Sequence, residues 1–331
     1  MSAQPSGQPL LLLIDPAARA VDGESVRVAK DVLCAGASVK VAIPESPGEL
    51  ARALEHRGRR RPVVVGGDRA LHRVVQVLYQ RRELAAPVSL IPVGPAADIS
   101  LALRLGLPTH PVPAARAALS GAERRLDLLV DDRGGVVLGG VEISGTCGET
   151  ADRGRGRAGR GSIGRGQVGG WANGTATGGP HPRWGAVAQS ARRSLVRGLK
   201  VPLMGRSGER LPKLRVEADG VVLVDLHHPV ELVTLSSTWA ANGFGDSQGR
   251  HQDASGAHGA EEARGDGRPG DGPVQVLISR PAAAAPLRVS AHTVTVSGRG
   301  FRYAADAEPS GPVRTRTWTA RPGALRLTVP G

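Results

Sequence analysis

The sequence predicts an α/β N-terminal domain with a parallel sheet, followed by a mostly antiparallel, β-sandwich-like C-terminal domain. Two consecutive units of strand, glycine turn and helix between residues 63 and 108 favour parallel strands. Short β-branched runs separated by turns between residues 274 and 329 favour an antiparallel sandwich. Apolar residues make up 40 % of the chain and aromatic residues only 2 %, so both cores must consist mainly of Val, Leu, Ile and Ala.

The N-terminal part alternates between apolar runs and helical patterns. We expect strands at Leu10–Ile14 and Ser38–Ile43, and helices at Glu24–Ala35 and Ser46–Glu55. Ser46 followed by Pro47 is a typical helix start, because the hydroxyl group caps a backbone N–H and proline fits the first turn. Cys34 lies on the apolar side of its helix and is expected in the core. The basic segment Arg57–Arg61 is expected to be a solvated loop, with anion binding as the alternative.

The stretch from Val63 to Pro108 is the part around which the rest of the chain is organised. It contains two strands, Val63–Val65 and Val88–Pro92, and each strand is followed by a turn, Gly66-Gly67-Asp68 and Gly94-Pro95. A helix follows each turn: the first is indicated by the spacing of Leu71, Val74, Val75 and Leu78, and the second is Ile99–Leu105. Because parallel strands end at the same edge of a sheet, both turns lie where open α/β sheets bind ligands. His72 and Arg73 are expected on the exposed face of the first helix.

Gly66 and Gly67 suit a loop that binds an anion. Without a Cβ atom they can adopt positive φ and bring backbone N–H groups close to a phosphate. The N-terminus of the following helix adds the positive end of its dipole. An ordinary turn can have the same sequence, so Gly-Gly-Asp by itself leaves both interpretations open.

The C-terminal half predicts a second, β-rich domain. A short helix at Pro113–Leu119 precedes a hairpin of Arg124–Val130 and Gly135–Ile143 across residues 131–134. Further strands are expected at Lys213–Glu217, Val221–Leu226, Val230–Thr238, Val274–Ser279, Leu287–Ser290, Thr293–Ser297, Phe301–Ala304, Val313–Thr319 and Leu325–Val329. The predicted boundaries are 9–123 for the α/β nucleotide-binding-like domain, and 124–144 with 184–331 for the β-rich domain.

Two segments, 145–183 and 240–272, have no apolar periodicity and are predicted to be disordered inserts. The first contains the RG-rich run RGRGRAGRGSIGRGQVGG, for which a linker and an RNA-binding segment are the alternatives. Trp184–Leu199 is predicted to be an amphipathic basic helix, which either packs on a sheet or lies on anionic lipid. The 46 glycine and 25 proline residues agree with a partly unstructured chain.

The formal charge of +13 attracts anionic partners such as nucleotides, acidic lipid or nucleic acid, although a compositional bias towards arginine would produce the same charge. Cys34 and Cys147 are too few for a disulfide framework or a cysteine-rich metal site. Leu10–Ile14 is too short for a signal peptide, and no run approaches the roughly 20 apolar residues of a membrane helix. We expect a cytoplasmic protein that can contact an anionic membrane surface.

The segments LLLIDPAAR, GGDRALHRVVQVL, IPVGPAADISLALRLGLP and ADAEPSGPVRTRTWTARPGALRLTVP follow one another along the chain. They resemble, in this order, the opening strand and N-P-x-x-G loop, the GGDGT segment, the P-L-G-T-G-N-D-F-A-R-A-L-G-I-P segment and the D-G-E-x-x segment of the diacylglycerol kinase catalytic-domain family. This family includes bacterial lipid kinases and sphingosine kinases. The resemblance implies an NAD kinase/diacylglycerol kinase-like fold.

The sequence departs from the family's motifs at several positions. GGDGT is here Gly66-Gly67-Asp68-Arg69-Ala70, without the third glycine and the threonine hydroxyl group. G-T-G-N-D is here Gly94-Pro95-Ala96-Ala97-Asp98, and Pro95 removes a backbone N–H that a phosphate loop could use. The family's opening Asn is Asp15. Arg69 can replace the lost amides with a charged donor, or it can fill the pocket.

The resemblance implies ATP-dependent phosphoryl transfer to a lipid hydroxyl group, with ATP and Mg²⁺ as cofactors. The residues that would bind the nucleotide are Asp15, Gly66, Gly67, Asp68, Arg69, Gly94 and Asp98. Asp306 matches the family's general base, with Glu308 beside it, and Asp271 aligns loosely with an aspartate that organises magnesium. On a strand, Asp306 and Glu308 would point to the same side, which suits a paired role; two solvated acids at a strand end are the alternative.

Two hypotheses of different classes follow. Retention of four acidic residues favours a lipid kinase with weak activity; these are Asp68, Asp98, Asp306 and Glu308. The substitutions at positions 69, 70, 95 and 96 favour a catalytically inactive kinase-fold protein that binds a nucleotide, a lipid or a protein partner. RNA binding through the RG-rich insert is a third alternative.

Overall fold

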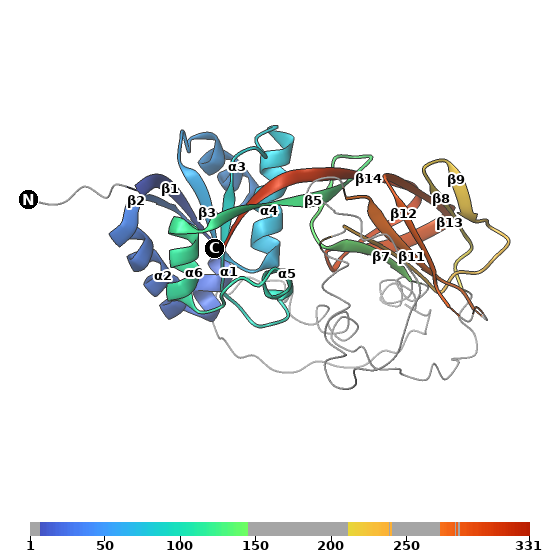
Figure 1. Cartoon of the computed structure of the whole chain (residues 1–331), viewed down its shortest axis with the longest axis horizontal. Coiled ribbons are helices and arrows are strands. Elements are labelled where there is room, and N and C mark those ends of the chain that lie inside the picture. The colour runs from blue at the N-terminus through green and yellow to red at the C-terminus, as the bar shows by residue number, and fades with distance from the viewer. Residues whose placement is uncertain (1–6, 145–210, 238, 240–271, 282, 284) are drawn as a thin grey trace, which may run out of the picture. The chain divides into compact units, whose positions relative to one another are not determined.

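The computed structural model describes residues 7–144, 211–237, 239, 272–281, 283 and 285–331. Within these ranges, the strands form one mixed sheet with the order β12-β11-β10-β7-β13-β14-β4-β3-β1-β2, to which β5, β6, β8 and β9 are added at the sides (Figure 1). The predicted Asp271, the helix Trp184–Leu199 and both predicted inserts, apart from residue 272, lie outside the described residues.

The N-terminal part contains the parallel strands. The strands are β1 (Gly7–Ile14), β2 (Ala37–Ala42), β3 (Arg61–Gly66) and β4 (Val88–Pro92). The helices are α1 (Pro16–Val21), α2 (Gly23–Gly36), α3 (Pro47–Glu55), α4 (Asp68–Gln80), α5 (Ser100–Arg104) and α6 (Pro111–Ser120). The strand β2, which follows β1 in the chain, pairs with one edge of β1, and β3 pairs with the other edge. The strand order therefore reverses between β1 and β3, which is the place where such sheets bind ligands.

Helices cover both faces of the parallel strands, so these strands are apolar on both sides. Leu10, Leu12 and Ile14 belong to the core that includes α2 and α6. Leu11 and Leu13 belong to the core that includes α3 and α4. The apolar stripe predicted for α4 is buried there, and the predicted Ser46 cap of α3 is confirmed by the N–H of Glu49, which donates to Ser46 Oγ at 3.3 Å.

The C-terminal part is rich in strands and mostly antiparallel, as predicted. Its strands are β5 (Ala122–Asp131), β6 (Val136–Val137), β7 (Gly140–Ser144), β8 (Leu214–Ala218), β9 (Val221–Val224), β10 (Leu232–Ser236), β11 (Val274–Ser279), β12 (Leu287–Ala291), β13 (Thr293–Ala305) and β14 (Glu308–Val329). The long strand β14 pairs with β13 and β5 in antiparallel fashion and ends beside β4 in parallel fashion. β14 therefore carries the sheet from the C-terminal part into the N-terminal part.

Several predicted elements differ from the structure. The segment Gly135–Ile143 is two strands, of which β6 pairs with β5 and β7 pairs with β10 and β13. The two short strands expected within 293–304 are one strand, β13, and those expected within 313–329 are parts of β14. In both cases bulges at glycine-containing segments interrupt the register without ending the pairing. The helix α1 was not predicted.

Two side-chain predictions also need correction. Cys34 is exposed, because the buried stripe of α2 consists of Val26, Ala29 and Leu33. Arg57 is not a solvated loop residue: its side chain is 13 % exposed and forms an ion pair with Glu83. None of the helices in the described ranges is both long and apolar enough to cross a lipid bilayer.

Candidate functional site

Three loops meet at the carboxyl ends of β1, β3 and β4. They contain Asp15, the segment Gly66–Asp68 and the segment Gly94–Asp98. The backbone N–H of Asp15 donates to the carbonyl oxygen of Val65 at 2.9 Å, and that of Val93 donates to Gly66 at 3.1 Å. The structure thus brings the nucleotide-binding residues predicted from the sequence to one edge of the sheet.

The glycine residues of the β3–α4 loop are required by close packing between loops. A Cβ atom on Gly66 would lie 2.9 Å from the Cβ atom of Asp15. A Cβ atom on Gly67 would lie 2.6 Å from the carbonyl oxygen of Asp98. The same carbonyl oxygen accepts the backbone N–H of Asp68 at 2.7 Å. The amide of Asp68 is therefore occupied by the neighbouring loop in this structure.

Gly94 is the loop glycine with the most room. Its φ of +143° lies in the region that favours glycine, and a Cβ atom there would make only ordinary contacts, at 3.8 Å or more. The N–H of Asp98 donates to the carbonyl oxygen of Pro95 at 2.8 Å, which closes this loop as a turn. Pro95 itself offers no N–H.

The carboxylate of Asp68 caps the short helix α5. Its Oδ2 atom accepts a hydrogen bond from the Ser100 hydroxyl group at 2.9 Å and from the N–H of Leu101 at 2.8 Å. Its Oδ1 atom is buried and has no hydrogen-bond partner within the described ranges. Burial raises the pKa of Asp68, against the opposing effect of the two hydrogen bonds. Asp68 thus holds the second loop against the first.

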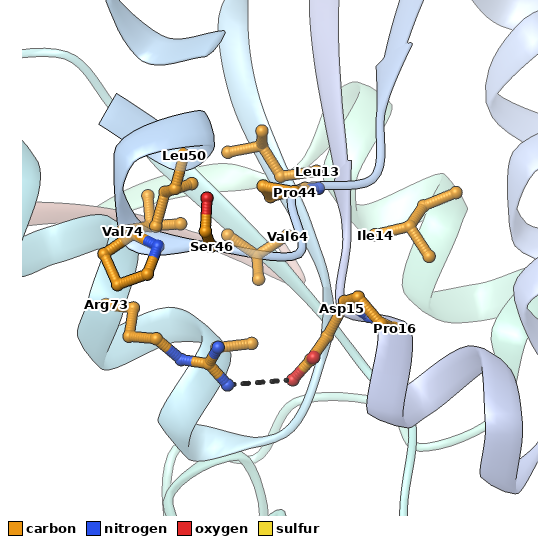
Figure 2. Close-up of a pocket in the computed structure, with 12 residues that line it drawn as sticks. Leu13, Ile14, Asp15, Pro16, Pro44, Ser46, Leu50, Val64, Arg73 and Val74 are labelled. Carbon is orange, nitrogen blue, oxygen red and sulfur yellow. Dashed lines mark hydrogen bonds and ion pairs between the residues drawn. The ribbon is translucent and has the colours of Figure 1, made fainter. Parts of the chain in front are cut away.

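A pocket lies at the point where the strand order reverses (Figure 2). Leu13, Asp15 and Val64 line it from the strand ends, and Leu50 and Arg73 line it from α3 and α4. Arg73 Nη2 lies 3.4 Å from Asp15 Oδ2, and this ion pair faces the pocket. The volume of the pocket is about 30 Å³, which is room for about two water molecules. Arg73, expected only on an exposed face, is thus part of the site.

The residues Asp306 and Glu308 do not lie together on a strand, contrary to the sequence prediction. Asp306 and Ala307 form the two-residue turn between β13 and β14, with φ of +49° and +66°. The carboxylate of Asp306 accepts three backbone N–H groups, from Leu138 at 2.7 Å, Gly139 at 2.6 Å and Gly140 at 3.2 Å. These three bonds fix the turn against the segment between β6 and β7.

The Asp306–Glu308 turn lies against α4, the helix that begins in the Gly-Gly-Asp loop. Glu308 forms an ion pair with Arg69, and the two side chains are 49 % and 65 % exposed. His72 Nε2 lies 3.9 Å from Asp306 Oδ2 and 2.7 Å from the carbonyl oxygen of Val136. The structure therefore brings the Gly-Gly-Asp segment and the last of the four motifs together.

Gln76 is a further residue of this contact that the sequence did not indicate. Its amide group donates to the carbonyl oxygen of Gly134 at 2.9 Å and accepts the N–H of Val136 at 2.8 Å. With His72 it fastens α4 to the turn between β5 and β6. The helical periodicity places His72 and Gln76 on the polar side of the helix, but it does not indicate that they bind the turn between β5 and β6.

The positive charge at this edge of the sheet suits the phosphate groups of a nucleotide, but the pocket there is smaller than a nucleotide needs. Arg69 and Arg73 lie one helical turn apart on α4, and both are exposed. Ligand pockets usually measure about 300–1,000 Å³, so a nucleotide needs more room than the pocket beside Arg73 has here. Within the described ranges, no three His, Cys, Asp or Glu side chains form a group that could hold a metal ion.

Comparisons with known proteins agree with the resemblance of the motifs. Residues 9–130 match the family model of the diacylglycerol kinase catalytic domain. A solved structure described as a diacylglycerol kinase from Bacillus anthracis strain Sterne matches with a TM-score of 0.59 at 12 % identity, covering 98 % of this chain and 97 % of that one. Another, provisionally described as a diacylglycerol kinase from the same strain, gives a TM-score of 0.60 at 13 % identity, covering 98 % of both. No curated protein matches the chain. At such identities the structural likeness is one of fold.

Proposed function

We propose that this chain, with its diacylglycerol kinase-like fold, is a lipid kinase of low turnover that transfers a phosphoryl group from ATP to a lipid hydroxyl group. The observation that supports this proposal is the contact between the Asp306–Glu308 turn and α4. Phosphoryl transfer requires cations that hold phosphates and carboxylates on the side of the acceptor. Here Arg69, from the Gly-Gly-Asp segment, is paired with Glu308, from the last of the four motifs.

Arg69 and Arg73 are the residues that would hold the phosphates of the nucleotide, which supplies the transferable phosphoryl group. A guanidinium group can bind phosphate oxygens in a bidentate manner and so replace lost backbone amides. In this structure each arginine is paired with a carboxylate, Glu308 or Asp15. The pair of Arg69 with Glu308 is exposed on both sides, and such pairs contribute only about 0–1 kcal/mol, so a polyphosphate can displace Glu308. Asp15 is largely buried, but Arg73 itself is exposed and can turn towards a phosphate. Opening of the pair between Arg73 and Asp15, which lines the pocket, would also enlarge the pocket.

On the acceptor side, release from Arg69 would leave Glu308 free to contact the lipid head group. Asp306 would hold the turn in place through its three backbone hydrogen bonds. The net charge of +13 favours work at the surface of an anionic membrane. Mg²⁺ and the role of Asp271 remain predictions from the resemblance, and no step is assigned to them.

A second candidate function is that of a catalytically inactive kinase-fold protein, which binds a nucleotide, a lipid or a protein partner. It is favoured by the occupied amide of Asp68, by the missing N–H of Pro95 and by the three backbone hydrogen bonds that the carboxylate of Asp306 already accepts. In this case nucleotide binding would be retained without phosphoryl transfer, or the edge of the sheet would serve another ligand.

Titration calorimetry with ATP and Mg²⁺, followed by a radiolabelled phosphate-transfer assay over a lipid panel, separates the two candidates. Arg69→Ala and Arg73→Ala should each weaken ATP binding about tenfold or more, because each removes a charged hydrogen-bond donor. Arg116→Ala, at an exposed position on α6, is the matched control and should leave it unchanged. Binding without transfer favours the second candidate. No binding at millimolar ATP overturns the kinase proposal.

A further inference from the structure

Arg104 reaches from α5 to the segment between β6 and β7. It is the last residue of α5, and it is exposed. A Cβ atom on Gly139 would lie 2.8 Å from Arg104 Nη2 and 3.1 Å from Asp306 Oδ1. The guanidinium group of Arg104 and the carboxylate of Asp306 therefore lie against the same side of Gly139. The structure thus places a cation beside the turn that the last of the four motifs forms.

Glycine is required at position 139 by space and not by backbone conformation. The φ of Gly139 lies outside the left-handed region, so residues with a side chain can adopt its conformation. Gly139 is buried, and the nearest groups on the side of a Cβ atom are the two charged ones. Any side chain at this position would push against Arg104 or Asp306. Glycine therefore allows the guanidinium group to approach the turn.

Arg104 also lies within electrostatic reach of Asp68 in the β3–α4 loop. Burial is the largest influence on the pKa of Asp68 and raises it, whereas the positive charge of Arg104 is among the effects that lower it. The two residues belong to opposite ends of one short element, because Asp68 caps the start of α5 and Arg104 ends this five-residue helix. Arg104 is thus close both to the loop on the nucleotide side and to the turn on the acceptor side.

We propose that Arg104 binds the phosphoryl group while it passes from the nucleotide to the lipid, an inference that rests on the proposed kinase function. The terminal phosphate is negatively charged, and the carboxylates of Asp68, Asp306 and Glu308 would repel it. A guanidinium group is always charged and has five N–H donors, so it can bind the phosphoryl oxygens on both sides of the transfer. Stabilisation of this charge is the main catalytic task in phosphoryl transfer.

The proposed step is a direct transfer. The oxygen atom of the lipid hydroxyl group forms a bond to the terminal phosphorus atom of ATP, and the bond from that phosphorus atom to the bridging oxygen breaks. The electron pair of the broken bond leaves with ADP. The hydroxyl proton passes to a carboxylate of the turn, the role that the resemblance gives to Asp306, and then to water. Arg104 exchanges no proton and donates hydrogen bonds to the phosphoryl oxygens throughout.

The test compares the full chain with Arg104→Ala and Arg104→Lys, using ATP and dioctanoylglycerol as substrates. Arg104→Ala should lower kcat by about 100- to 1,000-fold, the usual effect of removing one preorganised donor. The Kd for ADP should stay within about twofold of the parent, because ADP lacks the transferred group. Arg104→Lys should recover about tenfold of the loss in kcat, since lysine keeps the charge without the planar fork. Arg19→Ala removes the exposed arginine in the last turn of the short helix α1 and, as the matched control, should change neither value.

Two outcomes would overturn the inference. The first is a kcat of Arg104→Ala within about threefold of the parent, which is far less than the loss of such a donor causes. The second is a Kd for ADP that weakens as much as kcat falls. In that case Arg104 would hold the nucleotide or the fold, and not the phosphoryl group that moves.

A parent chain that transfers no phosphate would refute only the proposed kinase function. Binding of dioctanoyl phosphatidate, the phosphorylated lipid, then tests whether Arg104 holds a phosphoryl group. Arg104→Ala should weaken this binding about tenfold, because a charged hydrogen bond to the phosphate is lost. Equal binding by the parent and Arg104→Ala, or no binding by the parent, overturns the inference. Circular dichroism establishes that each variant is folded.

Discussion

Arg69 forms an ion pair with Glu308, and this pair joins the Gly-Gly-Asp segment to the last of the four motifs. In the diacylglycerol kinase motif that this segment resembles, a glycine stands in the place of Arg69, so this chain has a cation where that motif has none. Both partners are exposed, which makes the contact easy to open. A phosphate and Glu308 would compete for the same guanidinium group.

Removal of the charge at Glu308 should therefore strengthen nucleotide binding. We expect Glu308→Gln to lower the Kd for ATP by about two- to fivefold at low salt, which corresponds to the small free energy of an exposed ion pair. Titration calorimetry measures this effect. Glu123→Gln, which removes the exposed carboxylate paired with Arg326, serves as the control and should leave the Kd unchanged. An unaltered or weaker affinity in Glu308→Gln would show that the pair does not compete with phosphate.

Asp68 should contribute to the stability of the fold even when no ligand is bound. Its carboxylate caps α5 through Ser100 and Leu101, so Asp68→Ala should reduce the free energy of unfolding by about 1–2 kcal/mol. Asp68→Asn keeps one oxygen acceptor and removes a charge that burial disfavours, and it should reduce stability less. Urea unfolding of the two variants checks the order. Asp31→Ala, at an exposed ion pair on α2, is the control. Equal losses in both Asp68 variants would contradict the capping role.

Periodicity was sufficient for the strand and the helix that flank the two glycine turns between residues 63 and 108. The strand β4 has the predicted limits, and the predicted stripe of α4 is buried. The turn at Asp306 and Ala307 was not predictable, because Ala307 stands at the second positive-φ position, where such a turn usually has glycine. The break between β6 and β7 depends on hydrogen bonds to Asp306, which is far away in the sequence. No local pattern contains such information.

The same limit explains the contacts of α4. Its polar face was predicted to be exposed, yet His72 and Gln76 bond to the backbone around Val136. The sequence pattern of a helix does not distinguish a polar residue that is solvated from one that binds the carbonyl group of a distant strand. The motifs located the edge of the sheet, whereas the partners that fix its geometry come from tertiary packing.

The stability of the chain should depend on the ionisation of Glu142. Its pKa in the folded state is raised above the ordinary value of 4.5. The group therefore favours the folded state fully below the unfolded pKa, and this contribution is lost as pH rises through the folded pKa. We expect Glu142→Gln to be more stable than the parent at pH 7, by at most about 1 kcal/mol for a half-exposed side chain. Urea unfolding at pH 7 and near pH 4 should show that the difference in stability between Glu142→Gln and the parent is present at pH 7 and disappears near pH 4. A constant difference would contradict burial as its cause.

Ala307 should be a site where glycine stabilises the fold. Its φ of +66° lies in the left-handed region, which is unfavourable by about 1–2 kcal/mol for residues other than glycine. Ala307→Gly removes this strain, although a more flexible unfolded chain offsets about 0.4–1 kcal/mol of the gain. We expect a net increase of about 0.5 kcal/mol in the free energy of unfolding, measured by urea titration. Ala35→Gly, at an exposed helical position of α2, should have the opposite sign because glycine is a poor helix former. If both variants lost stability, the turn would not have the left-handed geometry at position 307.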